Sequence, residues 1–398
     1  MPLLFYDLHL TGHHVEFLYH LIKYKIEFSN CASFLILTHP KIWPKLRELQ
    51  LPIDLQAIGV TLHHPRPDEM LRLSKAKSVH KRAEEELRIV NRVVRMHKVK
   101  VCYFMTLNSF QFALGNHINK MLPCRIRGIL FNPLGTVKSN LPKKLIRIRK
   151  ELTIWWMLRN KKIEHIYLLN NDKMANILNL KYKRKGLFVA APDPVMVIPE
   201  GEQDYEFIKL VRPSKRMRFL AFGSLSSRKG IFLVLKALWQ LPECLDKQIE
   251  IVFAGKIVEN ERKTFKNAVS ELVKARPNIA VQYVDEFLPY GAIRALFTSS
   301  DVILIPYLAS HASSGVVGHA ALYGKPVIGP ASGLLGRLIK TYNLGTAIPE
   351  IDAEKLSSAF QKYLSNDKQW GKHQGMQLFV KERHPIRFVE TLLLGHGC

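Results

Sequence analysis

Apolar and polar residues follow one another in blocks along the whole chain, and the block lengths match strands and helices. Short apolar runs bounded by polar or turn-forming residues predict buried strands. In the first half of the chain these runs are Leu3–Tyr6, Phe34–Thr38, Val101–Met105, Ile126–Phe131, Ile166–Leu169 and Leu187–Ala190. In the second half they are Phe219–Gly223, Ile249–Ala254, Val281–Val284, Val302–Pro306 and Val327–Ile328.

Between the strand runs, apolar residues recur at the spacing of a helix face. The predicted helices are Val15–Lys23, Lys75–Lys98, Gly230–Leu241, Glu259–Ala275, Tyr290–Thr298, Gly315–Leu322, Ala353–Leu364 and a last stretch at about Ile386–Leu394. Strands and helices that alternate from end to end are typical of parallel, doubly wound sheets. The pattern therefore predicts an α/β protein.

The length of 398 residues suits two domains of ordinary size. We predict an N-terminal domain over 1–198, a linker rich in proline and charge over 199–215, and a C-terminal domain over 216–383. The last helix, at about 384–398, is expected to cross back to the first domain. The N-terminus lacks a basic segment and a cleavage site, so we expect a strand there rather than a signal peptide. No apolar run reaches the roughly 18 residues of a membrane span.

The chain is strongly basic, with 59 Lys and Arg against 33 Asp and Glu and a formal net charge of +26. This excess favours anionic partners such as phosphorylated substrates, anionic lipids or nucleic acid. The cysteines are odd in number and have no zinc or redox spacing, which favours reduced thiols in the cytoplasm. They are Cys31, Cys102, Cys124, Cys244 and Cys398.

A turn at Gly223–Gly230 follows a predicted strand and opens a predicted helix. Glycine at the strand end lets the backbone approach a ligand closely. Arg228 and Lys229 supply cationic groups of the kind that bind a diphosphate. Taken by itself, the turn is equally explained as a solvated basic helix cap.

A second turn lies after the strand run Val302–Pro306, where Ser313, Ser314 and Gly315 open an apolar helix. The first turn of a helix leaves N–H groups unpaired and is the positive end of its dipole, so it binds anions. It also follows the carboxyl end of a predicted parallel strand, where open α/β sheets bind ligands. Serine and glycine are ordinary N-caps as well, so this turn is informative mainly together with the first.

In their order and spacing, the two turns closely resemble the donor-binding half of glycosyltransferase family 4, over about 219–364. The sequences that carry the resemblance are GSLSSRKG at 223–230 and SGVVGHAALYGKPVIG at 314–329. The first half is similar more loosely, through LLFYD at 3–7, TGHHV at 11–15 and APDPV at 191–195. The resemblance implies the GT-B fold, in which two Rossmann-like domains face a cleft. It also implies that a sugar passes from a nucleotide sugar to a hydroxyl acceptor with retained configuration.

Carried over by position, the resemblance implies that Lys229 and Arg228 bind the donor diphosphate. Together with the amides near Gly315, they would stabilise this group as it leaves. His311 would orient the transferred sugar, and the donor phosphate would accept the acceptor's proton. The donor-side positions are Gly12, His13, Gly223, Ser224, Glu286, Ser313, Ser314, Gly315, Val316 and His319. His14 and Asn108 are expected on the acceptor side, although either histidine of the glycine loop is equally explained as a helix cap.

The chain departs from the family pattern at three positions. The family has an arginine after the first glycine, where this chain has Ser224. It also has two glutamates separated by seven residues, where this chain has His311 and His319. A histidine can hydrogen-bond hydroxyls, but it offers no carboxylate and its charge depends on pH near neutrality. No metal or other cofactor is expected, because the sequence lacks the acidic triplet of metal-dependent transferases.

The segment Lys138–Lys162 carries nine Lys or Arg against one Glu, and apolar residues lie among them at nearly helical spacing. Such a helix suits an anionic membrane surface, and Lys181–Lys185 adds charge nearby. A core-facing helix with a basic outer side is the alternative, and no recognition motif supports nucleic acid. The apolar residues are Leu145, Ile148, Leu152, Trp155 and Trp156.

These features favour a cytoplasmic enzyme on the inner face of the membrane, acting on glycan or polyprenyl-linked acceptors in bacterial surface polysaccharide assembly. Two other classes stay open. One is a catalytically silent GT-B protein that binds a nucleotide or glycan as a partner subunit, which the two histidines favour. The other is a peripheral protein whose basic surface binds anionic membranes.

Overall fold

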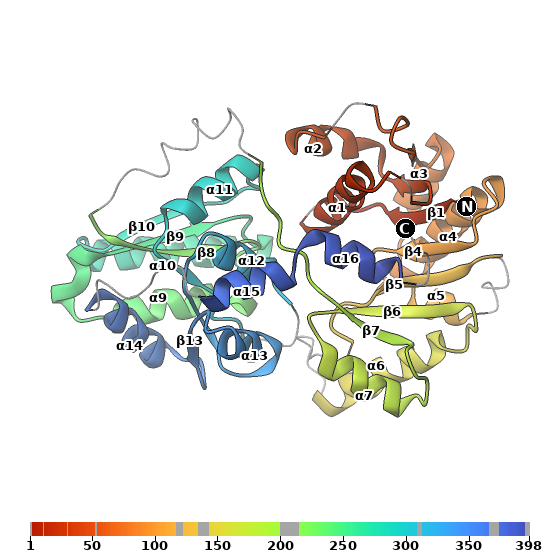
Figure 1. Ribbon diagram of the computed structural model, residues 1–398. Helices are drawn as coiled ribbons and strands as arrows, with labels where there is room; N and C mark the ends of the chain where they lie inside the picture. The colour runs from red at the N-terminus through yellow and green to blue at the C-terminus, as the bar shows by residue number, and fades with distance from the viewer. Residues whose placement is uncertain are drawn as a thin grey trace. The chain divides into compact units, whose positions relative to one another are not determined.

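A computed structural model describes residues 2–10, 12–29, 31–51, 54–116, 122–133, 143–199, 215–308, 313–365 and 374–394. The chain divides into two compact units (Figure 1), the first formed by Met1–Pro194 with His384–Cys398 and the second by Val195–Arg383. Most of the predicted linker 199–215 lies outside the described residues. Each unit contains one parallel sheet with helices on both faces.

The first unit is built on a seven-stranded sheet in the order β3-β2-β1-β4-β5-β6-β7. Its strands are β1 (Leu3–Asp7), β2 (Phe34–Thr38), β3 (Val60–His63), β4 (Val101–Phe104), β5 (Arg125–Ile129), β6 (Ile163–Leu169) and β7 (Phe188–Ala191). The central strand β1 is buried along its whole length and pairs in parallel with β2 and β4. A strand buried on both faces reads as a continuous apolar run, which explains the sequence signal.

Helices cover both faces of this sheet. They are α1 (His13–Glu27), α2 (Trp43–Glu48), α3 (Pro67–Lys75), α4 (Val79–Met96), α5 (Gln111–Gly115), α6 (Lys143–Met157), α7 (Asp172–Lys181) and α16 (Pro385–Leu392). On one face α4, α5, α6 and α7 enclose a core with Leu4, Tyr6 and Phe104. On the other face α1 packs on α16, and the rings of Phe17 and Phe388 stack at 5.1 Å.

The second unit has a six-stranded parallel sheet in the order β10-β9-β8-β11-β12-β13. Its strands are β8 (Met217–Phe222), β9 (Ile249–Ala254), β10 (Ala280–Val284), β11 (Val302–Leu304), β12 (Val327–Pro330) and β13 (Gly345–Ile348). The side chains of β8 alternate between two cores. Phe219 packs on one face, and Leu220 packs on the other.

Helices α9 (Ile231–Trp239), α10 (Arg262–Ala275) and α14 (Ala353–Leu364) form the first of these cores with the sheet. Helices α11 (Tyr290–Ser299), α12 (Gly315–Leu322), α13 (Gly333–Thr341) and α15 (Gln374–Glu382) form the second. In the described part of this unit, the helices and strands thus form two cores, one on each face of the sheet.

The predicted α/β class and parallel, doubly wound sheets are confirmed. The helix predicted over Lys75–Lys98 is confirmed as α4, with a later start, because α3 ends at Lys75. Helix α4 begins after Ser78, whose hydroxyl accepts the Lys81 amide at 3.2 Å as an N-cap. The edge strands β3 and β13 were not predicted, because most of their residues are half-exposed and give no apolar run.

Candidate functional site

Each sheet reverses its strand order at one point, and this point marks the expected ligand site. In the first unit the reversal lies between β1 and β4, and in the second it lies between β8 and β11. Open α/β sheets bind ligands beyond the carboxyl ends of the strands at such a switch point. The sequence motifs of both halves lie there, Gly12 to His14 after β1 and Gly223 to Gly230 after β8.

In the second unit, Lys229 lies over the end of β8. A Cβ atom on Gly223 would lie 2.7 Å from the Lys229 ammonium, and the positive φ of 102° at this position favours glycine. The ammonium also lies 3.5 Å from the Phe222 carbonyl oxygen and 5.2 Å from the centre of the Tyr307 ring. This half-buried cation is therefore held where the strand ends, as phosphate binding requires.

The turn that carries Lys229 is tied to the loop after β11. The Leu308 amide donates to the Arg228 carbonyl at 3.0 Å, and a Cβ atom on Gly230 would lie 2.3 Å from the Pro306 carbonyl oxygen. Gly230 itself has a positive φ of 78°, a conformation that glycine adopts without strain. This close approach of two backbones holds the motif rigidly at the switch point.

Helix α12 begins at the same switch point. Its N-cap residue, Ser314, does not use its side chain to cap the helix, and its hydroxyl oxygen lies 3.4 Å from the Tyr307 hydroxyl oxygen. Tyr307 thus lies beside both the Lys229 ammonium and the start of α12. The arrangement combines a lysine cation with the positive end of a helix, and both stabilise phosphate charge.

The remaining donor-side predictions fall in different environments. His319 is buried inside α12, with its ring 5.2 Å from the Phe297 ring. Arg228, Ser224 and Glu286 are exposed. Ser313 and Gly315 are half-buried at the start of α12, and Val316 is buried one residue further on. His311 lies outside the described residues.

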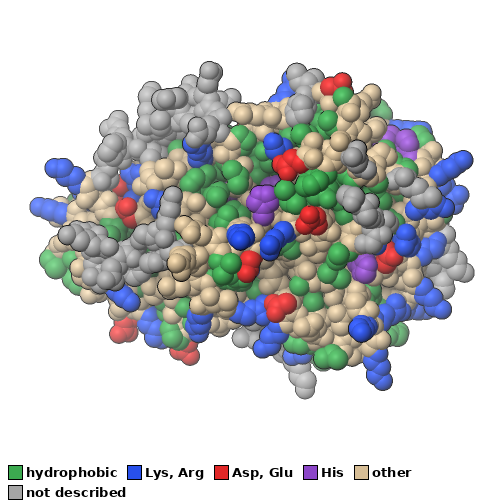
Figure 2. Space-filling model, in the orientation of Figure 1, with side chains coloured by type: hydrophobic (Ala, Val, Ile, Leu, Met, Phe, Trp, Pro, Cys, Tyr) green, Lys and Arg blue, Asp and Glu red, His purple; other side chains and the backbone are tan. Residues whose placement is uncertain are grey.

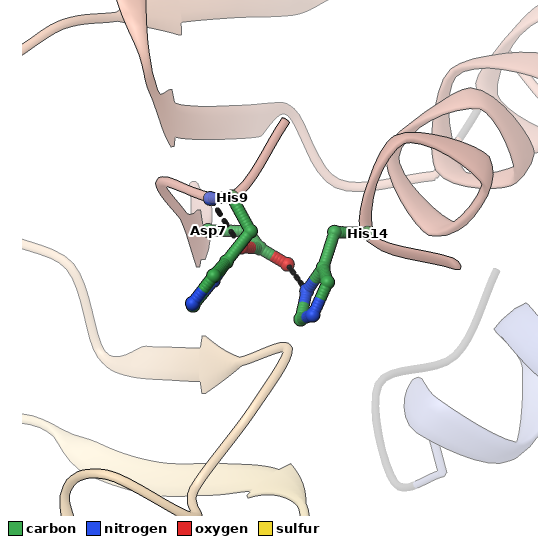
Figure 3. Close-up of side chains that lie close together, drawn as sticks. All are labelled: Asp7, His9 and His14. Carbon is green, nitrogen blue, oxygen red and sulfur yellow. Dashed lines mark hydrogen bonds and ion pairs between the residues drawn. The ribbon is translucent and has the colours of Figure 1, made fainter. Parts of the chain in front are cut away.

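In the first unit, the end of β1 carries a cluster formed by Asp7, His9 and His14 (Figure 3). Asp7 is the last residue of the strand, and its side chain is fully buried. Its two carboxylate oxygens contact different imidazoles, Oδ2 at 2.6 Å from Nδ1 of His14 and Oδ1 at 2.9 Å from Nδ1 of His9. The His9 amide also donates to Oδ1 at 2.9 Å.

The cluster favours the charged forms of Asp7 and His9. Burial by itself would raise the pKa of the Asp7 carboxyl, but hydrogen bonds from His14 and His9 outweigh it and hold this pKa below its ordinary value. The hydrogen bond to Asp7 raises the pKa of His9, against the opposing effect of burial. Asp7 is therefore an ionised carboxylate in a dry position, paired with imidazole N–H groups.

Within the described part of the chain, these three side chains form the group whose ligand atoms lie close enough for a metal ion, within 4.8 Å of one another. Their separations are nevertheless those of hydrogen bonds. Two ligands on one tetrahedral zinc ion lie about 3.3 Å apart, given zinc–nitrogen bonds of about 2.0 Å. Sequence reasoning selected His14 but missed Asp7 and His9. The available signal was an acidic residue that ends an apolar strand before a glycine loop.

The other site residues predicted in this unit are Gly12, His13 and Asn108. Gly12 is exposed and has a φ of 59° and a ψ of −141°. His13 Nδ1 lies 3.4 Å from Glu16 Oε2, one helical turn along α1. The Asn108 amide donates to the Phe131 carbonyl at 2.8 Å and accepts the Phe131 amide at 2.9 Å. Asn108 thereby links the loops that follow β4 and β5, so at least part of its role is structural.

Comparison with known proteins gives a family model that matches part of the chain and solved structures that share its fold. Residues 202–374 match the family model described as glycosyl transferases group 1. No curated protein sequence matches the chain. Among solved structures, Alr3699/HepE of Anabaena in complex with UDP and glucose is 15% identical, with a TM-score of 0.68 and coverage of 99% of this chain and 98% of that chain.

Two further structures show the same likeness. Sucrose-phosphate synthase from Thermosynechococcus elongatus is 14% identical, with a TM-score of 0.68 and coverage of 99% and 97% of the two chains. WaaG, a glycosyltransferase involved in lipopolysaccharide biosynthesis, is 15% identical, with a TM-score of 0.66 and coverage of 100% of both chains. At such identities the likeness shows the fold, which is GT-B with two parallel Rossmann-like sheets.

Proposed function

We propose that this chain, whose residues 202–374 match the family model of glycosyl transferases group 1, is a retaining glycosyltransferase. It would transfer a hexosyl group from a uridine diphosphate sugar to a hydroxyl of a glycan or lipid-linked acceptor. The nucleotide-sugar class of the donor follows from the family. The uridine base is proposed because the similar HepE was solved with UDP and with UDP-glucose.

One observation carries the proposal for the donor site. The Lys229 ammonium and the start of α12 converge on Tyr307 at the β8/β11 switch point. Both would stabilise the negative charge that grows on the diphosphate as its bond to the sugar breaks, and prearranged charges of this kind lower the barrier directly. Arg228, which is exposed, would add a second cation, and His311 would orient the sugar.

Calorimetry with UDP tests this assignment. A charge-assisted contact to phosphate contributes about 1.5–3 kcal/mol, so Lys229→Ala should weaken UDP binding by roughly tenfold or more. Lys236→Ala is the matched control, because Lys236 is an exposed lysine on the neighbouring helix α9. Unchanged UDP affinity in a folded Arg228→Ala/Lys229→Ala double variant would contradict the donor site.

For the acceptor, we propose a lipid-linked glycan at an anionic membrane. Helix α6 already has a core face with Ile154 and Met157 buried, yet it exposes a separate apolar stripe. Trp155 is 54% exposed and Leu152 is 59% exposed, which is unusual for side chains of this size without a partner. The full stripe is Leu145, Ile148, Leu152 and Trp155, and its spacing places it along one side of the helix.

The neighbouring helix α7 extends this surface. Lys181 pairs with Glu151 at 2.6 Å, and the Tyr182 hydroxyl donates to the Glu151 carbonyl at 3.1 Å, so the end of α7 is fixed against α6. Leu180 on α7 is 80% exposed. Figure 2 shows Lys and Arg side chains exposed over the part of the surface that α6 and α7 form, with hydrophobic side chains between them.

This mixture of exposed apolar and basic side chains fits a surface of anionic lipid. None of the helices in the described ranges is long and apolar enough to cross a membrane. We also propose that the enzyme acts on the cytoplasmic face of a membrane, in surface polysaccharide assembly. The role of the similar WaaG in lipopolysaccharide biosynthesis supports this setting.

Sedimentation with phosphatidylglycerol vesicles tests the membrane surface. Binding should be strong at low salt and fall as salt screens the charges. Replacement of Lys143, Lys144, Arg147 and Arg149 by Gln should abolish it. Lys263→Gln/Lys274→Gln, on exposed positions of α10, is the charge-matched control for two of these changes and should bind as the natural protein does. Equal binding to neutral vesicles would contradict the proposal.

A further inference from the structure

The turn that carries Arg228 and Lys229 is held by a carboxylate from another part of the chain. This turn is a single turn of 3-10 helix, Ser227–Lys229. Glu261 Oε1 accepts a hydrogen bond from the Ser227 hydroxyl at 2.6 Å, and Oε2 accepts one from the Ser227 amide. Both oxygens of one carboxylate therefore bind the residue that precedes the two cations.

We propose that Glu261 is a positioning residue of the donor site, which acts through Ser227 to hold the Lys229 ammonium where the diphosphate binds. This inference rests on the proposed function, since it concerns the same donor site. It assigns Glu261 no contact with the substrate. All the residues involved lie in the second unit, so the arrangement is complete within that unit.

Glu261 is itself fixed by the segment 255–261, which follows β9 and leads into α10. The Glu261 amide donates to the Val258 carbonyl at 2.9 Å. The Val258 amide in turn donates to the Leu225 carbonyl at 3.0 Å, and Leu225 belongs to the stretch between β8 and the 3-10 turn. The segment therefore contacts the phosphate turn through its backbone as well as through the Glu261 side chain.

Two further backbone contacts join the same segments. The Leu225 amide donates to the Lys256 carbonyl at 2.9 Å, and Leu225 pairs in parallel with Ile257. A Cβ atom on Gly255 would lie 2.2 Å from the Gly223 carbonyl oxygen, so the two backbones touch. The backbone before the 3-10 turn is therefore fixed by the segment after β9, while the loop after β11 contacts its far end.

A second carboxylate keeps the supporting segment in place. Asp285 follows β10, and its Oδ1 accepts the Ile257 amide at 2.9 Å. Its Oδ2 lies 2.7 Å from Nε of Arg262, the first residue of α10 and the neighbour of Glu261. The two carboxylates thus have different parts, because Asp285 holds the segment and Glu261 holds the turn.

The negative charge of Glu261 allows positioning to be separated from electrostatics by the sign of the effect. A carboxylate near a phosphate site repels the ligand, so its charge by itself disfavours donor binding. Its hydrogen bonds to Ser227 act in the opposite direction, because they hold the turn in place and are of the stronger, charge-assisted kind. Removal of the whole side chain should therefore weaken UDP binding, whereas removal of a nearby negative charge alone should not.

Calorimetry with UDP on the full chain tests this sign. Glu261→Ala should weaken UDP binding by about three- to tenfold, the range expected for one or two lost hydrogen bonds. Glu261→Gln should recover most of the affinity, because its amide can accept the Ser227 N–H and donate to the Ser227 hydroxyl. A loss in Glu261→Gln as large as that in Glu261→Ala would contradict the inference.

Glu259→Gln is the matched control. Glu259 lies in the same 3-10 turn as Glu261, is 81% exposed and pairs with Arg262 instead of with the phosphate turn. Its replacement removes the same charge without a contact to Ser227, so UDP binding should stay unchanged or become slightly tighter. A loss equal to that of Glu261→Ala would mean that charge near this turn, and not the contact with Ser227, supports binding.

A double-mutant cycle separates positioning from a general loss of structure. If Glu261 acts through Lys229, Glu261→Ala should weaken UDP binding by less than about twofold in a Lys229→Ala background, since the two changes remove one interaction. An undiminished effect in that background would overturn the inference. So would natural UDP affinity in a folded Glu261→Ala variant.

Two further results keep the test decisive. If Glu261→Ala does not fold, Ser227→Ala removes only the hydroxyl contact and should weaken UDP binding by about two- to fivefold. Natural UDP affinity in Ser227→Ala would then overturn the inference. Failure of the proposed function gives a different result: the natural chain does not bind UDP, or Lys229→Ala binds it unchanged. In that case the donor site is wrong, and this inference falls with it.

Discussion

The two switch points of this protein occupy equivalent places in similar sheets, yet their chemistry differs. The β8/β11 switch point combines a lysine cation, a helix start and glycines that admit close backbone contact. The β1/β4 switch point combines a buried carboxylate with two imidazoles. The fold supplies the position in both cases, whereas the side chains decide which charges are found there.

The largest expected effect concerns the backbone contact at the phosphate turn. Gly230→Ala should cost about 2–4 kcal/mol of unfolding free energy, since it combines positive-φ strain with a Cβ atom 2.3 Å from the Pro306 oxygen. Gly186→Ala in the first unit has the same kind of φ, 76°, but no described atom within 4 Å, so it should cost only about 1–2 kcal/mol. Urea unfolding measures both. Equal losses would mean that the contact with Pro306 does not matter.

The second prediction compares how the stability loss depends on pH for one substitution in each unit. Asp7→Asn removes charge-assisted hydrogen bonds and should lower the free energy of unfolding by about 1.5–3 kcal/mol in total. The raised pKa of His9 gives stability that is full below about pH 6.5 and is lost as pH rises through its folded value. The lowered pKa of Asp7 gives stability that is present above about pH 3.9 and is lost as pH falls through its folded value. The loss in Asp7→Asn should thus be largest between about pH 4 and 6.5.

Glu250→Gln in the second unit is the counterpart. Glu250 pairs with Arg218 at 3.0 Å in a buried position, and an arginine keeps its charge across this range. The penalty of Glu250→Gln should therefore be the same at pH 6 and pH 9. Around His9, the other titratable or charged groups are His14 on α1 and Glu86 and Arg82 on α4. A pH-independent penalty for Asp7→Asn would show that the imidazoles do not stabilise its charge.

A smaller effect is expected at His319, where the family has a glutamate. One neutral hydrogen bond contributes about 0.5–1.5 kcal/mol, so His319→Ala should weaken UDP and UDP-sugar alike by about two- to tenfold. His311→Ala should instead lower turnover strongly and UDP affinity little. Calorimetry and initial rates measure the two effects. If a His311→Glu/His319→Glu variant gains a transfer activity that the natural chain lacks on every donor, the silent-partner hypothesis is correct.

The smallest effect concerns the return of the chain to the first unit. The Tyr167 hydroxyl donates to the Leu392 carbonyl at 2.8 Å, so Tyr167→Phe should cost about 1 kcal/mol. Tyr363→Phe in the second unit should cost less, because the Tyr363 hydroxyl oxygen lies 3.3 Å from the Thr346 hydroxyl oxygen. Neither change should alter UDP affinity. Weaker UDP binding in Tyr167→Phe would mean that the units are not energetically independent.

The predictable part of the site was the part encoded locally. Gly223, Lys229 and Gly230 lie within one turn, and a turn after a buried strand can be recognised without knowing what surrounds it. The contact of Lys229 with Tyr307 joins residues that are far apart in the chain, so no local sequence pattern predicts it. The same holds for Asp7, which sequence reasoning treated as the residue after a strand.

By itself, the sequence determined the α/β class, the strands with buried faces and the two turns beside the switch points. It could do so because a parallel strand that is buried on both faces is a continuous apolar run in the sequence. A helix with one buried face has apolar residues at regular helical spacing. Tertiary structure alone decided which faces are covered. The spacing of Leu152 and Trp155 is the same whether their side chains meet a core or water. Only the packing of the opposite side of α6 on the sheet leaves them exposed.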